Sequence, residues 1–461
     1  MPIQTLKWCA LSYCWGEDQA CKTTLENYQD RLKNLDYDSL PKTIQDAVRA
    51  AHLFDIEFLW VDSLCIIQDS ASDLASQLGR MHDIYKYAWV TFAASRAKIC
   101  SEGFLHDRPF RPVVGEPSFG QLPYICKDGT NSTIMLSFIT YNIPNTSSEP
   151  LQSRAWTLQE TYLSTRLVEF ASKQSHWRCT VTTGYDGFYS QFLYQADWAQ
   201  YHEEQGPDWF NQAWSNLIYE YSGRNLTYLG DKFPAVSAIA EGFAEQSKYS
   251  MGNYIAGLWE KTLLTDLLWY HGDPETPIKA TNKQYIAPSW SWASVEGTVF
   301  MWIRANAANN MDIEVGDLLV PAAEICSYKV EKLYGNVPFG PVKSGVITIK
   351  GMLKTAIWRL GQSQSTLHSD EGPNAICIAD AVEDAREPRQ IHESALIIKE
   401  VYCLQILSWS NGYVGLFLEP RYVVGRTEYR RIGMFVNRGT YSTPELREFW
   451  AAADRIAIFL I

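Results

Sequence analysis

Polar side chains that could bind a ligand follow directly after a short apolar run of the sequence. The run, residues 58–61, has the composition of a strand that is buried on both faces, and Asp62 ends it. In open parallel sheets, ligands bind outside the carboxyl ends of the strands, where helix amino-termini point inward. Five residues are therefore candidates by position: Asp62, Ser63, Gln68, Asp69 and Ser70. The alternative for each is a helix cap or a loop-ordering contact.

A second group of chemically suitable side chains lies further along the chain: Arg154, Trp156, Gln159 and Glu160. The arginine could supply a cation for a phosphate or carboxylate, the tryptophan a stacking surface, and the glutamate an acid. Alternatively, the arginine and the glutamate form a buried ion pair that locks this segment against the first one. Tyr13 and Trp15 leave a similar choice open, because each could stack on a planar ligand or belong to the core.

Thiol and metal chemistry are disfavoured by the sequence. Cys65 has the apolar neighbours Leu64, Ile66 and Ile67, which raise rather than lower the pKa of a thiol, and no histidine is near it in sequence. The ten cysteines include no CxxC pair and no His-rich companion segment, so the spacing of zinc ligands is absent. We expect no metal ligands.

The elements that must position these side chains alternate between strand and helix over the first hundred residues. The pattern predicts strands near residues 5–15, 58–61 and 89–93, a helix that starts at Leu40-Pro41, and a helix with an apolar stripe over 74–88 that Ser70 or Ser72 caps. This order predicts an α/β fold, a parallel sheet with flanking helices.

The rest of the chain predicts two further parts. With 461 residues, the chain is too long for one ordinary core. Apolar residues recur at helical spacing over 208–270, and β-branched and aromatic segments beyond 285 favour an antiparallel sheet or barrel. Trp290 and Trp292 fit one face of a strand as packing residues. The predicted domains are an α/β domain (1–170), a helical middle region (171–284) and a β-rich C-terminal region (285–461).

Composition and charge exclude several classes of partner. The 40 basic and 52 acidic residues give a net charge of −12, which repels polyphosphate, and the basic residues are scattered. Nucleic-acid binding is therefore disfavoured. The first residues lack the pattern of a secretion signal, and the chain has no run of about 18 uncharged apolar residues. Cysteines inside apolar runs fit a reducing compartment, so we expect a cytoplasmic protein without membrane contact.

Five segments carry a resemblance to a known family: LSYCWG (11–16), LPKTIQDAVRAAHLF (40–54), FLWVDSLCIIQD (58–69), MHDIYKYAWVTFAAS (81–95) and SRAWTLQE (153–160). In this order they resemble the fungal heterokaryon incompatibility (HET) domain. Three later segments resemble the portion that commonly follows this domain: YSGRNLTYLGDKFPAVSAIA (221–240), YIAGLWEKTLLTDLLWY (254–270) and APSWSWASVEG (287–297).

The resemblance implies a TIR-like core, and relatives of the TIR kind often cleave NAD at the nicotinamide bond with the help of a glutamate. HET domains usually show an aspartate, a tryptophan and, three residues later, a glutamate. In this sequence Leu74 follows Asp73, and Gln77 takes the glutamate position, where it cannot carry the charge. Such a loss costs on the order of a hundredfold in rate. Asp73 or Glu160 could serve instead, which makes the catalytic candidates Asp62, Asp73, Gln77 and Glu160.

The resemblance further implies an effector of nonself recognition and programmed cell death with a pocket for a nucleotide-like ligand. The expected partners are a second copy, another fungal incompatibility protein, or a small molecule. Two alternatives remain open: an enzyme of fungal secondary metabolism that acts on an apolar small molecule, and a weak NAD glycohydrolase. No cofactor follows from the sequence itself, and NAD is the one that the resemblance allows.

Overall fold

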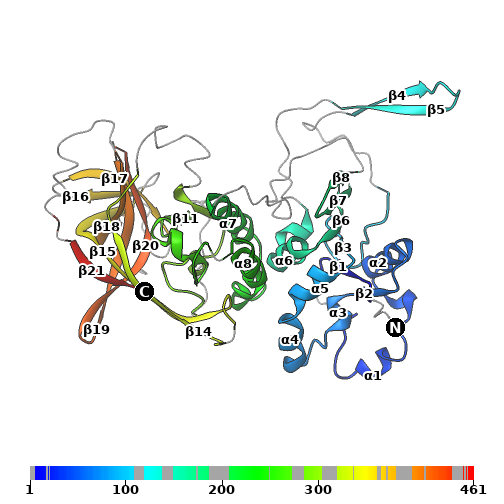
Figure 1. Cartoon of the computed structure of the whole chain (residues 1–461), viewed down its shortest axis with the longest axis horizontal. Helices are drawn as coiled ribbons and strands as arrows, with labels where there is room; N and C mark the ends of the chain where they lie inside the picture. Colours follow the sequence, from blue (N-terminus) through cyan, green and yellow to red (C-terminus); the bar gives the residue numbers. More distant parts are fainter. Residues whose placement is uncertain are drawn as a thin grey trace. The chain divides into compact units, whose positions relative to one another are not determined.

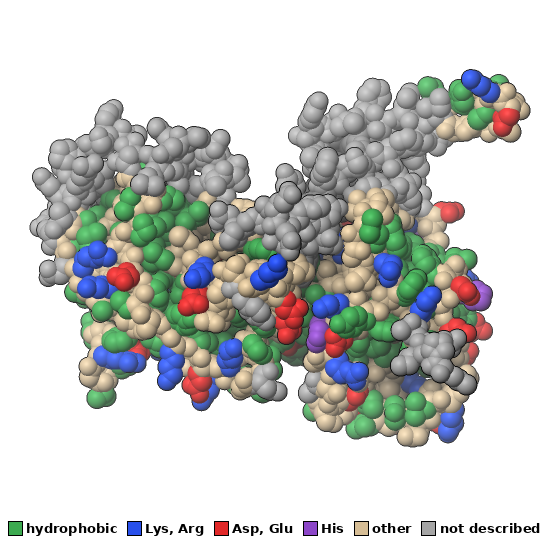
Figure 2. All heavy atoms as spheres, in the orientation of Figure 1, with side chains coloured by type: hydrophobic (Ala, Val, Ile, Leu, Met, Phe, Trp, Pro, Cys, Tyr) green, Lys and Arg blue, Asp and Glu red, His purple; other side chains and the backbone are tan. Residues whose placement is uncertain are grey.

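The computed structural model describes residues 6–16, 19, 21–107, 119–137, 149–172, 175–185, 207–248, 250–271, 285–303, 319–335, 337–360, 365–369, 372–380, 397–409, 412–438, 450, 453 and 455–461. The chain forms two compact units, residues 1–201 and 202–461 (Figure 1). Within the ranges above, no helix has both the length and the apolar character needed to cross a membrane. Basic and acidic side chains are interspersed over the face that Figure 2 shows.

A sheet with the strand order β2-β1-β3-β6-β7-β8 is the centre of the first unit (Figure 1). Four of its strands run parallel: β1 (Trp8–Ser12), β2 (Phe58–Trp60), β3 (Val90–Ala93) and β6 (Arg166–Phe170). Two antiparallel strands continue it, β7 (Ser175–Cys179) and β8 (Thr183–Tyr185). A separate hairpin consists of β4 (Phe119–Ile125) and β5 (Asn131–Ser137).

Helices cover both faces of this sheet. Side chains alternate along β1, so this strand offers buried side chains to the helices on each face. The helices are α1 (Tyr28–Arg31), α2 (Lys42–Leu53), α3 (Asp62–Cys65), α4 (Ala71–Leu78), α5 (Met81–Tyr87) and α6 (Ala155–Leu163). Cys9 and Leu11 pack in one core cluster with the apolar side of α2. Ala10 packs on the opposite face with Tyr85 of α5 and Trp156 of α6.

The predicted α/β class is confirmed, with one difference in the helices. The apolar stripe over 74–88 predicts one helix, but the chain forms two, α4 and α5, which a turn at Gly79 and Arg80 separates. Glycine is a poor helix former, and the stripe alone does not reveal the interruption. Of the two predicted caps, Ser70 is the one that caps α4, since its Oγ accepts a hydrogen bond from the Asp73 backbone N–H at 3.3 Å, whereas Ser72 lies within the helix.

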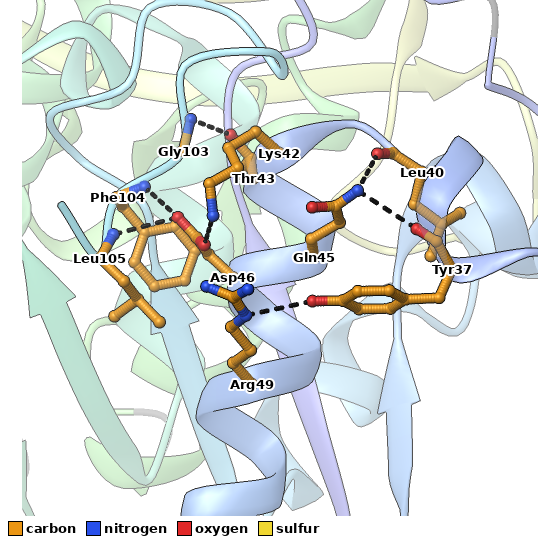
Figure 3. Close-up of polar contacts among 10 residues, drawn as sticks. All are labelled: Tyr37, Leu40, Lys42, Thr43, Gln45, Asp46, Arg49, Gly103, Phe104 and Leu105. Atoms are coloured by element: carbon orange, nitrogen blue, oxygen red, sulfur yellow. Dashed lines mark hydrogen bonds and ion pairs between the residues drawn. The ribbon is translucent and has the colours of Figure 1, made fainter.

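A buried aspartate in α2 fixes the segment that follows β3 (Figure 3). The fully buried Asp46 carboxylate accepts hydrogen bonds from the backbone N–H groups of Phe104, at 2.8 Å, and Leu105, at 3.1 Å, and from the Lys42 ammonium. Burial raises the pKa of Asp46, but these hydrogen bonds outweigh it and leave the pKa below its usual value. Gly103 has a φ of +73°, and a Cβ there would lie 2.5 Å from the Asp46 Oδ2.

Replacing this carboxylate should destabilise the first unit. We expect Asp46→Asn to lower the free energy of unfolding by about 2 kcal/mol, since it removes charge-assisted hydrogen bonds and buries an unsatisfied amide. Urea denaturation at pH 7 measures the change. The control is Asp38→Asn at an exposed position in the 3-10 helix Tyr37–Ser39, which should shift stability by no more than about 0.5 kcal/mol. Equal shifts in the two variants would contradict this role.

Tryptophan packing dominates the helical part of the second unit. Its helices are α7 (Pro207–Ser222), α8 (Pro234–Gln246) and α9 (Leu263–Asp266), and its short strands are β9 (Tyr254–Ile255), β10 (Leu258–Trp259), β11 (Trp269–His271) and β12 (Val299–Met301). Trp214 of α7 contacts Phe243 of α8 with a ring separation of 5.3 Å, and Trp259 at 5.5 Å. The strand predicted around Trp290 and Trp292 is wrong, because residues 292–294 form a 3-10 helix, although both indoles are fully buried as expected.

A nine-stranded, mainly antiparallel sheet forms the rest of the second unit and confirms the predicted β-rich C-terminal part. Its strands are β13 (Val320–Pro321), β14 (Glu324–Lys332), β15 (Val342–Leu360), β16 (Ser365–Ser369), β17 (Gly372–Ala379), β18 (Ile397–Trp409), β19 (Gly412–Val423), β20 (Arg426–Arg438) and β21 (Arg455–Leu460). The 19-residue β15 pairs with β14, β16, β18 and β21. Arg431 of β20 is buried against the Trp269 ring and donates to Asp380 at 2.9 Å.

Candidate functional site

The carboxyl ends of the parallel strands bring together three charged residues from distant parts of the sequence. Asp62 follows β2, and Arg154 and Glu160 lie at the start and in the body of α6. The Arg154 guanidinium donates to the backbone carbonyl of Tyr13, directly after β1, at 2.8 Å. The Trp15 indole N–H donates to Asp62 Oδ2 at 2.9 Å. This cluster of Asp62, Arg154 and Glu160 is called the carboxyl-edge cluster below.

Glu160 is the buried acid of this cluster. Its side chain is 6% exposed, and the Ser12 hydroxyl donates to its Oε2 at 2.5 Å. Burial and the negative charge of Asp62 raise the pKa of Glu160 to about 7, although hydrogen bonds from Ser12 and Tyr85 and the charge of Arg154 act in the opposite direction. At neutral pH this group can therefore both hold and release a proton.

Asp62 is half-buried, and its carboxylate accepts hydrogen bonds from several donors. Its Oδ1 accepts a hydrogen bond from the Ser63 backbone N–H at 2.6 Å, which also orders the first turn of α3. Burial raises the pKa of Asp62, while the Arg154 charge and the Trp15 hydrogen bond lower it, and the net pKa lies above the usual value. Arg154 thus acts electrostatically on both Asp62 and Glu160, so the ion pair that the sequence left open as an alternative is part of a group of three charged residues.

Tyr13 and Ser63 lie inside the first unit beneath this cluster. Tyr13 is 2% exposed, and its hydroxyl lies 2.8 Å from the Ser63 Oγ and 2.9 Å from the Gln19 Oε1. Ser63 is fully buried. Both residues have the environment of the core alternative, whereas Trp15 is partly exposed. Burial raises the pKa of Tyr13 far above its usual value, so its hydroxyl stays neutral.

The remaining polar residues after β2 order the loop. Gln68 donates its side-chain N–H to the carbonyls of Asp62, at 3.0 Å, and Ile66, at 3.1 Å, while Asp69 accepts from the Leu25 backbone N–H at 2.8 Å. The Asp73 Oδ2 accepts from the Ile67 backbone N–H at 2.8 Å, and its Oδ1 lies 3.4 Å from the Gln77 side-chain nitrogen. Asp73 and Gln77 therefore contact each other, and among the described residues neither side chain forms a hydrogen bond to the carboxyl-edge cluster.

Two candidates on α6 face different surroundings. Trp156 is partly buried and packs with Met81 and Tyr85, whereas Gln159 is almost fully buried. Sequence reasoning missed Ser12 and Tyr85, which both act on Glu160. The signal for Ser12 is its position as the last residue of a strand that ends at the ligand-binding edge. Tyr85 carries no comparable signal, because it sits at an apolar position of a helical stripe.

The raised pKa of Glu160 predicts how the stability of the fold depends on pH. Between pH 4.5 and 7 the unfolded chain loses this proton while the folded chain keeps it, so the contribution to stability falls as pH rises through this window. We expect Glu160→Gln, which mimics the protonated form, to be more stable than the parent at pH 8 by about 3 kcal/mol and similar to it at pH 4.5. Chemical denaturation at both pH values measures this.

The exposed Glu26→Gln serves as the control, because it removes the same charge without burial and should change stability equally little at both pH values. A pH-independent effect of Glu160→Gln would contradict the perturbed pKa.

Comparison with known families places this cluster within a recognised domain. Residues 8–160 match the family model described as Heterokaryon incompatibility protein (HET). Comparison of the chain with the curated proteins and with the solved structures gives no significant match. The matched range runs from the first residue of β1 to Glu160 and includes every site residue described above. Residues 8–160 of this chain are therefore a heterokaryon incompatibility (HET) domain.

Proposed function

We propose that the HET domain binds a nucleotide-like small molecule at the carboxyl-edge cluster and that Glu160 transfers a proton there. The biological setting would be fungal nonself recognition and programmed cell death in the cytoplasm, through contact with a second copy or with another incompatibility protein. The observation that carries the proposal is Glu160, a buried acid whose pKa is about 7, next to a second carboxylate and a cation.

Each member of the cluster fits a separate task. The Arg154 guanidinium suits a phosphate or carboxylate oxygen, and the partly exposed Trp15 suits a planar ring. Asp62 is more exposed than Glu160, so it is better placed to stabilise positive charge that develops on a ligand. The hydrogen bond from the Ser12 hydroxyl holds the Glu160 carboxyl group in one orientation.

Hydrolysis of NAD is the reaction that the carboxyl-edge cluster supports best. Water adds to the ribose carbon as the bond to nicotinamide breaks, nicotinamide leaves as a neutral molecule, and ionised Glu160 accepts the proton from water. Asp62 offsets the oxocarbenium-like charge of the transition state. Gln77, at the position where related domains usually have a glutamate, is not required by this scheme.

Nicotinamide release tests the proposal directly. The full chain is incubated with NAD, and free nicotinamide is measured by chromatography. We expect Asp62→Asn and Glu160→Gln to reduce the rate by at least about a hundredfold, since each removes a charge that acts in the transition state. The parent rate should rise as pH increases through about 7, where Glu160 ionises.

Gln77→Ala is the matched control. It alters the position where related domains usually have a glutamate and leaves the carboxyl-edge cluster unchanged, so it should retain the parent rate. Loss of activity in Gln77→Ala with full activity in Glu160→Gln would contradict the assignment. If the parent protein releases no nicotinamide and fails to bind ADP-ribose by calorimetry, the nucleotide proposal is wrong, and apolar substrates of secondary metabolism become the better hypothesis.

Cell death provides the biological readout. Induced expression of the parent chain in a filamentous fungus should kill hyphal cells, and Asp62→Asn should abolish killing at an equal protein level. Killing by Asp62→Asn at the parent frequency would separate the biological activity from this cluster.

A further inference from the structure

The amino edge of the same sheet, opposite the carboxyl-edge cluster, carries a surface that the proposed function does not use. We infer that this edge is a docking surface for a short acidic segment of a partner protein that also carries leucine or a similar apolar residue. It consists of Leu6, Lys7, Phe58, Lys86, Tyr87, Trp89 and Arg166 and is called the amino-edge patch below.

The strand register brings these residues to one edge. Trp8 pairs with Phe58, and the Trp89 backbone N–H donates to the Trp8 carbonyl at 2.8 Å. Arg166 is the first residue of β6, which pairs with β3. Because β2, β1, β3 and β6 are parallel neighbours, their first residues form a row whose members are about 5 Å apart from strand to strand.

Aromatic rings hold the cations of this row in place. The Lys7 ammonium lies 4.1 Å and the Arg166 guanidinium 4.5 Å from the centre of the Trp89 ring, and Lys86 lies 5.8 Å from that of Tyr87. Such contacts reduce the freedom of the long side chains, so a ligand has less conformational entropy to remove when it binds. The patch is therefore organised for anions before any partner arrives.

No carboxylate of the described chain neutralises these cations. None of Lys7, Lys86 and Arg166 forms an ion pair within the described residues, although Glu57 precedes β2 on the same edge. Ion pairs do form elsewhere in this unit, as between Lys33 and Asp30. Three cations of the amino-edge patch without an ion-pair partner among the described residues are thus a local exception in a unit whose 17 basic and 22 acidic residues, counted over 1–201, give a net charge of 17 − 22 = −5.

The chemistry of the patch favours a peptide over a membrane or a nucleic acid. Extended polyanions would meet the negative remainder of the chain at long range, whereas a short segment meets only the patch. Lys7 and Arg166 stand about two strand spacings, roughly 10 Å, apart. In a polyproline II segment, which has three residues per turn, carboxylates three residues apart lie on one side and about 9 Å apart. Leu6 and Tyr87, each 61% exposed, supply apolar contacts beside the charges.

A labelled peptide tests this surface. The probe repeats Glu-Leu-Ser four times, and its binding to the full chain is followed by fluorescence anisotropy; a peptide with Gln in place of Glu controls for charge. We expect the double variant Lys7→Glu, Lys86→Glu to bind the probe at least tenfold more weakly than the parent. Both lysines are exposed, so the fold should persist, which thermal unfolding checks.

The matched control is Lys33→Glu, Lys127→Glu, which changes the net charge equally at two exposed positions of the same unit. It should bind within about twofold of the parent. Equal losses in the two double variants, no binding of the probe at 1 mM, or equal binding of the Gln peptide would each overturn the inference. Patch-dependent binding of phosphatidylserine vesicles or of a single-stranded oligonucleotide without peptide binding would overturn it in favour of that partner.

Discussion

The hydrogen bond from the Arg154 guanidinium to the Tyr13 carbonyl joins two residues that are 141 positions apart, and the site depends on it. It fastens the start of α6 to the end of β1, and one consequence is that Glu160 lies against Ser12 in the interior. A carboxyl group in this position loses its hydration, and the nearby Asp62 adds repulsion. The arginine offsets part of both costs. The same residue thus sets where the acid lies and how strongly it holds its proton.

Local patterns were sufficient to predict much of the first unit. The apolar run before Asp62, the proline at the start of α2 and the stripe of α5 each belong to one element, so periodicity and capping rules apply to them. The break at Gly79 and the role of Asp46 escaped prediction for different reasons. The first depends on one residue inside a continuous stripe, and the second depends on backbone groups nearly sixty residues away.

The candidate site shows the same division between local and distant information. Position after a strand identified Asp62 as a candidate, and side-chain chemistry identified Arg154 and Glu160, but the sequence could not separate them from Gln68, Asp69 and Asp73, which order the loop. That distinction needs three-dimensional contacts, because all six residues are polar and residue type alone does not separate a site residue from a loop contact. In the second unit, the motif that contains Trp290 and Trp292 alternates as a strand would, yet Ser291 turns the chain by accepting the Ala293 backbone N–H at 3.1 Å.

The pairing of β15 with β21 has a consequence for biosynthesis. Residues 347–352 of β15 align with 455–460, so about a hundred residues must leave the ribosome before that edge of the strand receives its partner. During this interval the edge of β15 that later pairs with β21 has unpaired backbone N–H and C=O groups. Such groups can pair with another nascent chain, which leads to aggregation. Production of this unit should therefore be sensitive to chaperone supply and to the speed of translation.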